Sequence, residues 1–177
     1  LPGFNAGSYN DLSVGNPFAV TPTFNVERIN LIPVPIDLDT LRSFLQFELG
    51  LLPANAVITN ASLQLYQYYT LGSEDITIGV HQVSESWEED TINWSNRPTY
   101  ISEAESAITL IAGNTGWLFW DIIALVQGWL EGTIAIYGLM VKSMDEISDN
   151  SSIFCYSSDY MDDTLLRPKL EITYSLP

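Results

Sequence analysis

The sequence predicts an all-β fold, a two-sheet antiparallel β-sandwich with one short α-helix near residues 121–131. Several short segments alternate apolar and polar residues, which is the period of half-buried strands, and only one segment has apolar residues at helical spacing. Strands do not alternate with helices in the way that a parallel sheet requires. Many short strands in one chain favour a jelly roll among the sandwich topologies.

The strand-like period is clearest in the middle of the chain. Leu63 and Leu65 alternate with Gln64 and Tyr66. Residues 72–75, Gly-Ser-Glu-Asp, have the composition of a hairpin loop, so the segments on either side are expected to form a hairpin. The same period predicts further strands at residues 76–80, 134–141, 152–157 and 170–174.

One stretch has the helical period instead. Asp121 is a good N-cap, and Gly132 is suited to end a helix. The apolar stripe between them is wide, which predicts a helix that packs across a sheet: Ile122, Leu125, Val126, Trp129 and Leu130.

The length of 177 residues and the 46% content of apolar residues predict a single domain, residues 1–177, with one sizeable core. Residues 41–176 carry the regular strand pattern. Residues 1–40 form an atypical N-terminal segment, in which Pro17–Pro35 is expected to be a long loop or an edge strand.

The formal net charge is −16, from 6 Lys and Arg against 22 Asp and Glu. Such a field repels phosphate backbones and anionic lipids, so nucleic acid and membrane surfaces are not expected partners. The chain also has no run of about 18 apolar residues that would span a bilayer.

The acidic surface favours calcium as a structural ion, because carboxylates are the oxygen ligands that calcium prefers. No motif requires a cofactor, and a solvated acidic loop is the competing interpretation of each cluster. The candidate ligands lie in two expected loops: Asp145 with Asp149, and Asp159 with Asp162 and Asp163.

The sequence does not predict an enzyme. It contains no nucleophile elbow, phosphate-binding glycine loop or Cys-x-x-Cys pair. His81, the only histidine, lies in a strand pattern and is expected to be structural or to face solvent. Cys155, the only cysteine, is expected to be a small buried apolar residue.

The order of local motifs is more specific than that of a generic sandwich. An Arg-led strand and a Leu-Pro turn precede a strand of the form A-x-L-x-L-Y, and a Trp-rich segment, a helix and two closing strands follow. These motifs are residues 42–49, 52–53, 58–66, 87–98, 120–132, 156–160 and 167–174. In this order the chain resembles the DNRLRE, or disaggregatase-related, domains, which are grouped with carbohydrate-binding module family 96.

The resemblance implies a non-catalytic, secreted cell-surface module with a structural or adhesive role. It also implies binding of an extracellular polysaccharide, since some relatives bind alginate. One departure concerns the N-terminus, where the chain begins almost at the loop Asn5-Ala6-Gly7, so that a first strand is expected to be missing. An open sheet edge would accept a strand from another copy. The alternative is therefore a self-assembling subunit of an extracellular filament, sheath or surface layer.

Sugar rings stack their C–H surfaces on exposed aromatic side chains. Trp87, Trp94 and Trp129 are expected to fill the core. The net charge favours a neutral glycan over an acidic one, and three sequons, at Asn60, Asn93 and Asn150, predict N-glycosylation. The candidate glycan-binding residues are Tyr66, Tyr68, Tyr69, Tyr100 and Tyr160.

Overall fold

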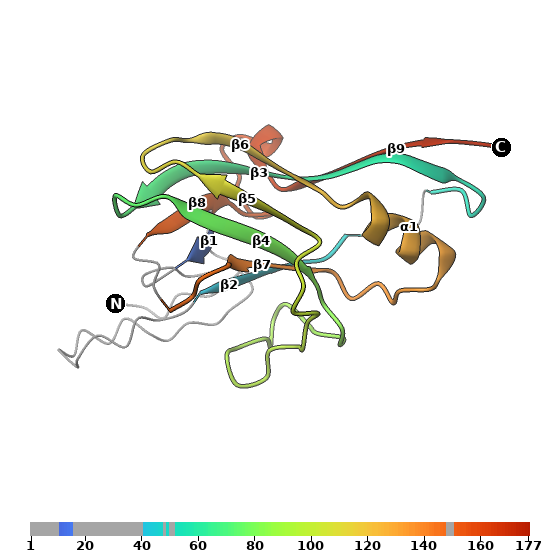
Figure 1. Ribbon diagram of the computed structural model, residues 1–177, viewed down its shortest axis with the longest axis horizontal. Coiled ribbons are helices and arrows are strands. Elements are labelled where there is room, and N and C mark those ends of the chain that lie inside the picture. The colour runs from blue at the N-terminus through green and yellow to red at the C-terminus, as the bar shows by residue number, and fades with distance from the viewer. Residues whose placement is uncertain (1–10, 16–40, 48, 50–51, 148–150) are drawn as a thin grey trace.

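The computed structural model describes residues 11–15, 41–47, 49, 52–147 and 151–177, which form two antiparallel sheets packed face to face (Figure 1). Sheet A contains β1 (Asp11–Gly15), β8 (Ser152–Tyr156), β3 (Val57–Leu71), β6 (Gly116–Asp121) and β9 (Lys169–Ser175). Sheet B contains β2 (Arg42–Leu45), β7 (Leu139–Ser143), β4 (Ile76–Gln82) and β5 (Ser106–Leu110). The helices are α1 (Ile123–Glu131) and the short 3-10 helix η2 (Thr164–Leu166).

The strand order is that of a jelly roll. Sheet A runs β1-β8-β3-β6 and sheet B runs β2-β7-β4-β5. The first strand thus pairs with the eighth, the second with the seventh, the third with the sixth and the fourth with the fifth, as in a long hairpin rolled into two layers. The prediction of a jelly-roll sandwich is confirmed. The ninth strand, β9, pairs with the first half of β3 and extends beyond the sandwich with it (Figure 1).

The predicted hairpin around residues 72–75 is wrong. β3 belongs to sheet A and β4 to sheet B, so residues 72–75 carry the chain from one layer to the other. Gly72 makes this turn with a positive φ of 97°. Turn-forming residues indicate where a chain reverses, but they do not determine whether the strands on either side hydrogen-bond to each other.

Two strands and two boundaries also differ from the sequence prediction. β5 and β6 were not predicted, and residues 134–138 precede β7 without being part of it. The helix begins at Ile123, because Asp121 still belongs to β6, although its Oδ1 accepts a hydrogen bond of 3.0 Å from the Ile123 N–H. The helix ends as predicted, at Gly132, with a φ of 70°.

The core lies between the sheets and is made by their inward-facing residues. Leu63, Leu65 and Val80 are fully buried, and the indole Nε1 of Trp120 on β6 donates a hydrogen bond of 3.0 Å to the Ile78 carbonyl on β4. This bond joins the two layers. The buried side chains that form this core also come from α1, which packs against β3, and include Leu125, Val126 and Trp129.

The first described strand of sheet A follows the Asn5-Ala6-Gly7 loop, whereas the strand that was expected to be missing would lie ahead of that loop, outside the described residues. Residues Asp11–Gly15 form β1 and pair in antiparallel register with Ser152–Tyr156 of the same chain. The rest of the atypical N-terminal segment, including Pro17–Pro35, lies outside the described residues. α1, the longest helix in the described part of the chain, is too short to cross a membrane.

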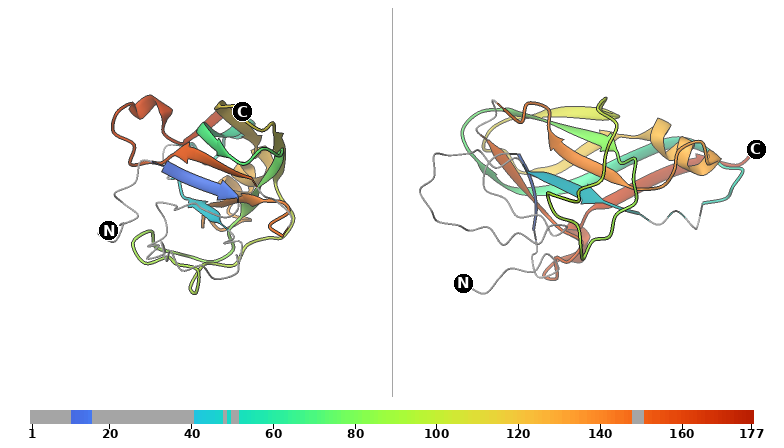
Figure 2. Two further views of the ribbon diagram at one scale, coloured as in Figure 1. Left: turned by 90° about the vertical axis from the view of Figure 1, so that its left-hand side faces the viewer. Right: turned by 90° about the horizontal axis from the view of Figure 1, so that it is seen from below.

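Residues 83–105 cover the outer face of sheet B, as the yellow-green loops at the bottom of Figure 1 show. A second, smaller core forms beneath them, from Phe44, Val83, Ile92 and Met140. Trp87 packs against this cluster, as predicted. Trp94 does not: its side chain is 43% exposed, which contradicts its assignment to the core. Figure 2 shows the two layers from the end and from below.

Candidate functional site

The outer face of sheet A carries a row of aromatic side chains, here called the aromatic row. Its members come from three neighbouring strands and the loop that follows β8. In each strand the alternation of side chains sends the apolar core residues inward and the rings outward. The row consists of Trp117 on β6, Tyr66 and Tyr68 on β3, Phe154 and Tyr156 on β8, and Tyr160.

A β-bulge in β3 concentrates rings at one place. The pairing with β8 shifts between Gln67, opposite Cys155, and Tyr69, opposite Phe154. Tyr68 is the extra residue of this bulge. Both Tyr68 and Tyr69 contact the Phe154 ring, at 6.4 Å and 5.5 Å between centroids.

The central rings stack on one another. The centroid of Tyr156 lies 3.8 Å from that of Tyr160 and 4.7 Å from that of Tyr68, with interplanar angles of 15° and 22°. Tyr66 is nearly parallel to Tyr156 at 5.9 Å and meets Trp117 edge to face at 5.4 Å. The row crosses the sheet at right angles to the strands and spans two strand spacings, about 10 Å.

Stacking limits which rings can hold a ligand. The faces of Tyr156 are turned toward its tyrosine neighbours, and the Lys169 ammonium lies 4.2 Å from the centroid of Trp117. Two aromatic residues beside the row remain open. Phe119 on β6 is 54% exposed and Tyr69 on β3 is 50% exposed. Phe119 and Tyr69 lie on the two sides of the aromatic row, and the ring of a ligand could stack on either of them.

The phenol of Tyr160 remains protonated over the physiological range. A hydrogen bond with the Tyr156 side chain, assisted by desolvation and by the negative charge of Asp162 and Asp163, raises the pKa of Tyr160 to about 12. A protonated phenol can both donate and accept, which suits the recognition of hydroxyl groups.

Of the predicted glycan-binding residues, Tyr66, Tyr68, Tyr69 and Tyr160 lie together on this surface. Tyr100 does not, because it belongs to the segment that covers sheet B and meets the His81 ring edge to face at 5.4 Å. Sequence reasoning missed Trp117, Phe119, Phe154 and Tyr156. The alternation of Phe154 and Tyr156 with buried Ile153 and Cys155 is the signal that could have found two of them.

His81 is buried beneath residues 83–105. Its Nδ1 makes a hydrogen bond of 3.0 Å with the Ile101 carbonyl, and its Nε2 has no partner among the described residues. Burial lowers the pKa of the imidazole. His81 therefore has the structural position that was one of its two predicted roles.

An ion cluster joins β2 to β7 beneath the same covering segment. The Arg42 guanidinium binds the Glu146 carboxylate through Nε and Nη2 at 2.8 Å and 2.9 Å, and Lys142 Nζ lies 3.4 Å from the same carboxylate. The guanidinium also lies 5.0 Å from the Trp94 ring centroid and 5.2 Å from that of Tyr100. Through the Arg42 guanidinium the cluster also contacts the covering segment.

Two of the aspartates proposed as calcium ligands accept local backbone hydrogen bonds. Asp145 accepts from the Ile147 N–H and Asp163 from the Leu165 N–H, so each closes a turn. One oxygen of Asp159, Oδ2, is buried without a hydrogen-bond partner in the described structure. Within that structure no three His, Cys, Asp or Glu side chains are grouped to hold a metal ion, and Asp149 lies outside it.

The sequons differ in their surroundings. Asn60 is exposed on β3. Asn93 uses its side-chain amide in a bond of 3.2 Å to the Thr91 carbonyl, within a turn. Asn150 lies outside the described residues.

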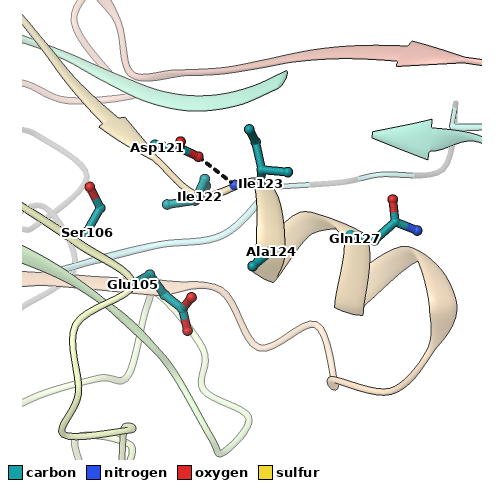
Figure 3. Close-up of a pocket in the computed structure, with 7 residues that line it drawn as sticks. All are labelled: Glu105, Ser106, Asp121, Ile122, Ile123, Ala124 and Gln127. Carbon is teal, nitrogen blue, oxygen red and sulfur yellow. Dashed lines mark hydrogen bonds between the residues drawn. The ribbon is translucent and has the colours of Figure 1, made fainter. Parts of the chain in front are cut away.

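A cavity lies at one edge of the sandwich, where the ends of β5 and β6 meet the start of α1 (Figure 3). Its volume is about 630 Å³. It is lined by Glu105, Ser106, Asp121, Ile122, Ile123, Ala124 and Gln127.

Comparison with known proteins places this fold and surface in a family. The chain matches carbohydrate-binding module family 96 over residues 35–174. It belongs to that family. The match covers the sandwich from the segment before β2 to β9, which includes every member of the aromatic row. No curated protein matches the chain.

Proposed function

We propose that this protein is a non-catalytic, secreted module that binds an extracellular polysaccharide through the aromatic row and the open rings of Phe119 and Tyr69. Membership of a carbohydrate-binding module family supports a carbohydrate ligand. The observation that carries the choice of surface is the collection of aromatic side chains on the outer face of sheet A. The resemblance of the motif series to the DNRLRE domains supports a place on a cell surface.

The arrangement of the rings supports a platform rather than a pocket. The stacked tyrosines support one another and hold their outer edges and hydroxyl groups at fixed positions. Phe119 and Tyr69 then offer ring faces on either side of them. A polymer chain that runs along the strands, and so crosses the aromatic row, would meet an open ring, a set of phenol groups and a second open ring in sequence, and stacking together with hydrogen bonds would stabilise it.

The opposite sheet is a poorer candidate for this role. Residues 83–105 cover its outer face, and Tyr100 is packed against His81 and Arg42 there. The filament alternative has less support than the binding role, because the family match favours carbohydrate binding and β1 pairs with β8 of the same chain. The strand that was expected to come from another copy would lie ahead of Asn5, outside the described residues.

Polysaccharide binding can be tested with a glycan array, followed by titration calorimetry with the best soluble ligand. We expect Phe119→Ala and Tyr69→Ala each to weaken binding about tenfold, since a stacked ring contributes on the order of 1 kcal/mol or more. Tyr174→Ala is the matched control, because Tyr174 is also an exposed tyrosine of sheet A but lies toward the end of β9 that extends beyond the sandwich.

Equal losses in all three variants, or no loss in the first two, would show that the ligand binds elsewhere. The array should be run with and without calcium, since the acidic surface favours that ion. If no neutral or acidic polysaccharide is retained under either condition, the proposed function is wrong.

A further inference from the structure

The edge cavity has the size and the lining of a small-ligand site. Its volume of about 630 Å³ falls within the range of about 300–1,000 Å³ that is typical of such sites. The lining combines apolar side chains at the start of α1 with polar side chains at the start of β5, just before it, and at the end of β6, as Figure 3 shows. Sugar rings have the same mixed character, with C–H faces and hydroxyl edges.

The polar lining consists mainly of hydrogen-bond acceptors. Glu105 and Asp121 contribute carboxylates, and only one oxygen of Asp121 is used by the Ile123 N–H. The Gln127 amide is already hydrogen-bonded within the protein: its oxygen accepts from the Ile58 N–H at 2.9 Å, and its nitrogen donates to the Glu131 carboxylate at 2.8 Å. Among the lining side chains, the Ser106 hydroxyl is therefore the one donor left for a ligand.

A cavity lined by two carboxylates favours an uncharged ligand over an anionic one. Hydroxyl groups can donate to both carboxylates, in charge-assisted hydrogen bonds that are stronger than neutral ones. A sugar acid would add a third negative charge to the site and would find few donors. Desolvation, with a smaller effect from Glu103, already raises the pKa of Glu105, which indicates that negative charge is unfavourable there.

The cavity is continuous with the surface proposed for binding. Phe119 and Asp121 lie on the same face of β6, two residues apart, which is about 7 Å along the strand. Their partners on β3 are Gln64 and Ser62. A polysaccharide on the aromatic row that continued past Phe119 would therefore reach Asp121 and the mouth of the cavity.

We propose that the cavity formed by Glu105, Ser106 and Asp121 is a specificity subsite for one uncharged sugar unit of the bound polysaccharide. This inference rests on the proposed function, and it narrows the ligand class from polysaccharides in general to neutral glycans. The subsite accepts hydroxyl donors at its two carboxylates, and Ile123 contacts the C–H surface of the sugar.

The experiment measures the affinity of the whole chain for soluble oligosaccharides of glucose, mannose and xylose, for an oligomer of a uronic acid and for an oligomer of a free amino sugar. Glu105→Gln and Asp121→Asn preserve shape, and Asn retains the oxygen that accepts from Ile123. We expect each to weaken binding of the neutral ligand about tenfold. Glu103→Gln is the control, since it removes the same charge from an exposed residue outside the cavity.

Thermal unfolding of each variant verifies that it is folded, and Ser106→Ala, expected to weaken binding severalfold, replaces any variant that is not. Neutral ligands that bind the parent and all cavity variants equally would overturn the subsite and leave the binding function standing. Binding restricted to the uronic acid or the amino sugar would also overturn it. Failure of every ligand to bind would refute the proposed function together with the subsite.

Discussion

The Glu146 carboxylate should be the main electrostatic link between β2 and β7, beneath the segment that covers sheet B. It binds Arg42 through two nitrogens, at 2.8 Å and 2.9 Å, and also lies 3.4 Å from Lys142 Nζ. The side chains of Arg42 and Glu146 are only 12% and 17% exposed, so water replaces these contacts poorly. Glu146→Gln preserves the shape and removes the charge, which leaves two cations without their counterion.

The expected loss of stability follows from the partial burial of Arg42 and Glu146. Breaking a fully buried pair costs about 3–5 kcal/mol, and an exposed pair contributes about 0–1 kcal/mol. Arg42 keeps the rings of Trp94 and Tyr100 beside it, and Lys142 keeps its bond to the Ser143 carbonyl. We therefore expect the free energy of unfolding to fall by about 2 kcal/mol, or Tm by about 4–8 °C in a protein of this size.

Equilibrium unfolding in urea measures this loss, with Glu103→Gln as an exposed control. A double-mutant cycle with Arg42→Met separates the interaction from the effect of each substitution alone. A loss below about 0.5 kcal/mol would place the cluster among ordinary surface pairs.

Three further predictions concern single residues. Gly138→Ala should lower the free energy of unfolding in urea by about 2 kcal/mol or more, because Gly138 has a φ of 90° and a Cβ would collide with the Leu45 carbonyl. Gly113→Ala, with a φ of 81° and open space around it, should cost less, and equal costs would refute the steric argument. Burial raises the pKa of the Cys155 thiol, so iodoacetamide at pH 8 should modify it only after unfolding, and rapid labelling of the folded protein would contradict this burial. Burial also lowers the pKa of His81 below 6.5, so an NMR titration of the imidazole should give a midpoint under that value, and a midpoint at or above 6.5 would contradict the assignment. Because the unfolded chain takes up the proton first, the contribution of His81 to stability is present above pH 6.5 and is lost as the pH falls through the lowered pKa.

The sandwich was predictable from sequence because its central strands alternate strictly. Leu63 and Leu65 are buried and Gln64 and Tyr66 are half-buried, as the period-two pattern required. β6 was harder, since Trp117, Leu118, Phe119 and Trp120 form one continuous apolar run. Such a run has no visible period when one face supplies the core and the other supplies an aromatic surface.

The members of the aromatic row and the edge cavity were predictable from sequence only in part. Four of the five candidate tyrosines lie on one face, because strand alternation and the bulge at Tyr68 place them there. Tyr100 was misplaced because its surroundings depend on how residues 83–105 fold back over sheet B. The edge cavity was not predicted, since Glu105 and Asp121 meet only through the jelly-roll arrangement that brings the edges of the two sheets together.

The cover over sheet B makes the module one-sided. A sandwich with two bare faces could lie on a flat polymer in either of two orientations. In the described part of this chain the stacked rings gather on one face, which gives the proposed ligand a single surface to bind. If several such modules were joined in tandem, avidity would depend on whether the linkers allow neighbouring domains to turn the same side toward one strand of the polymer. The geometry of the connections would then govern multivalent attachment as much as the affinity of each domain.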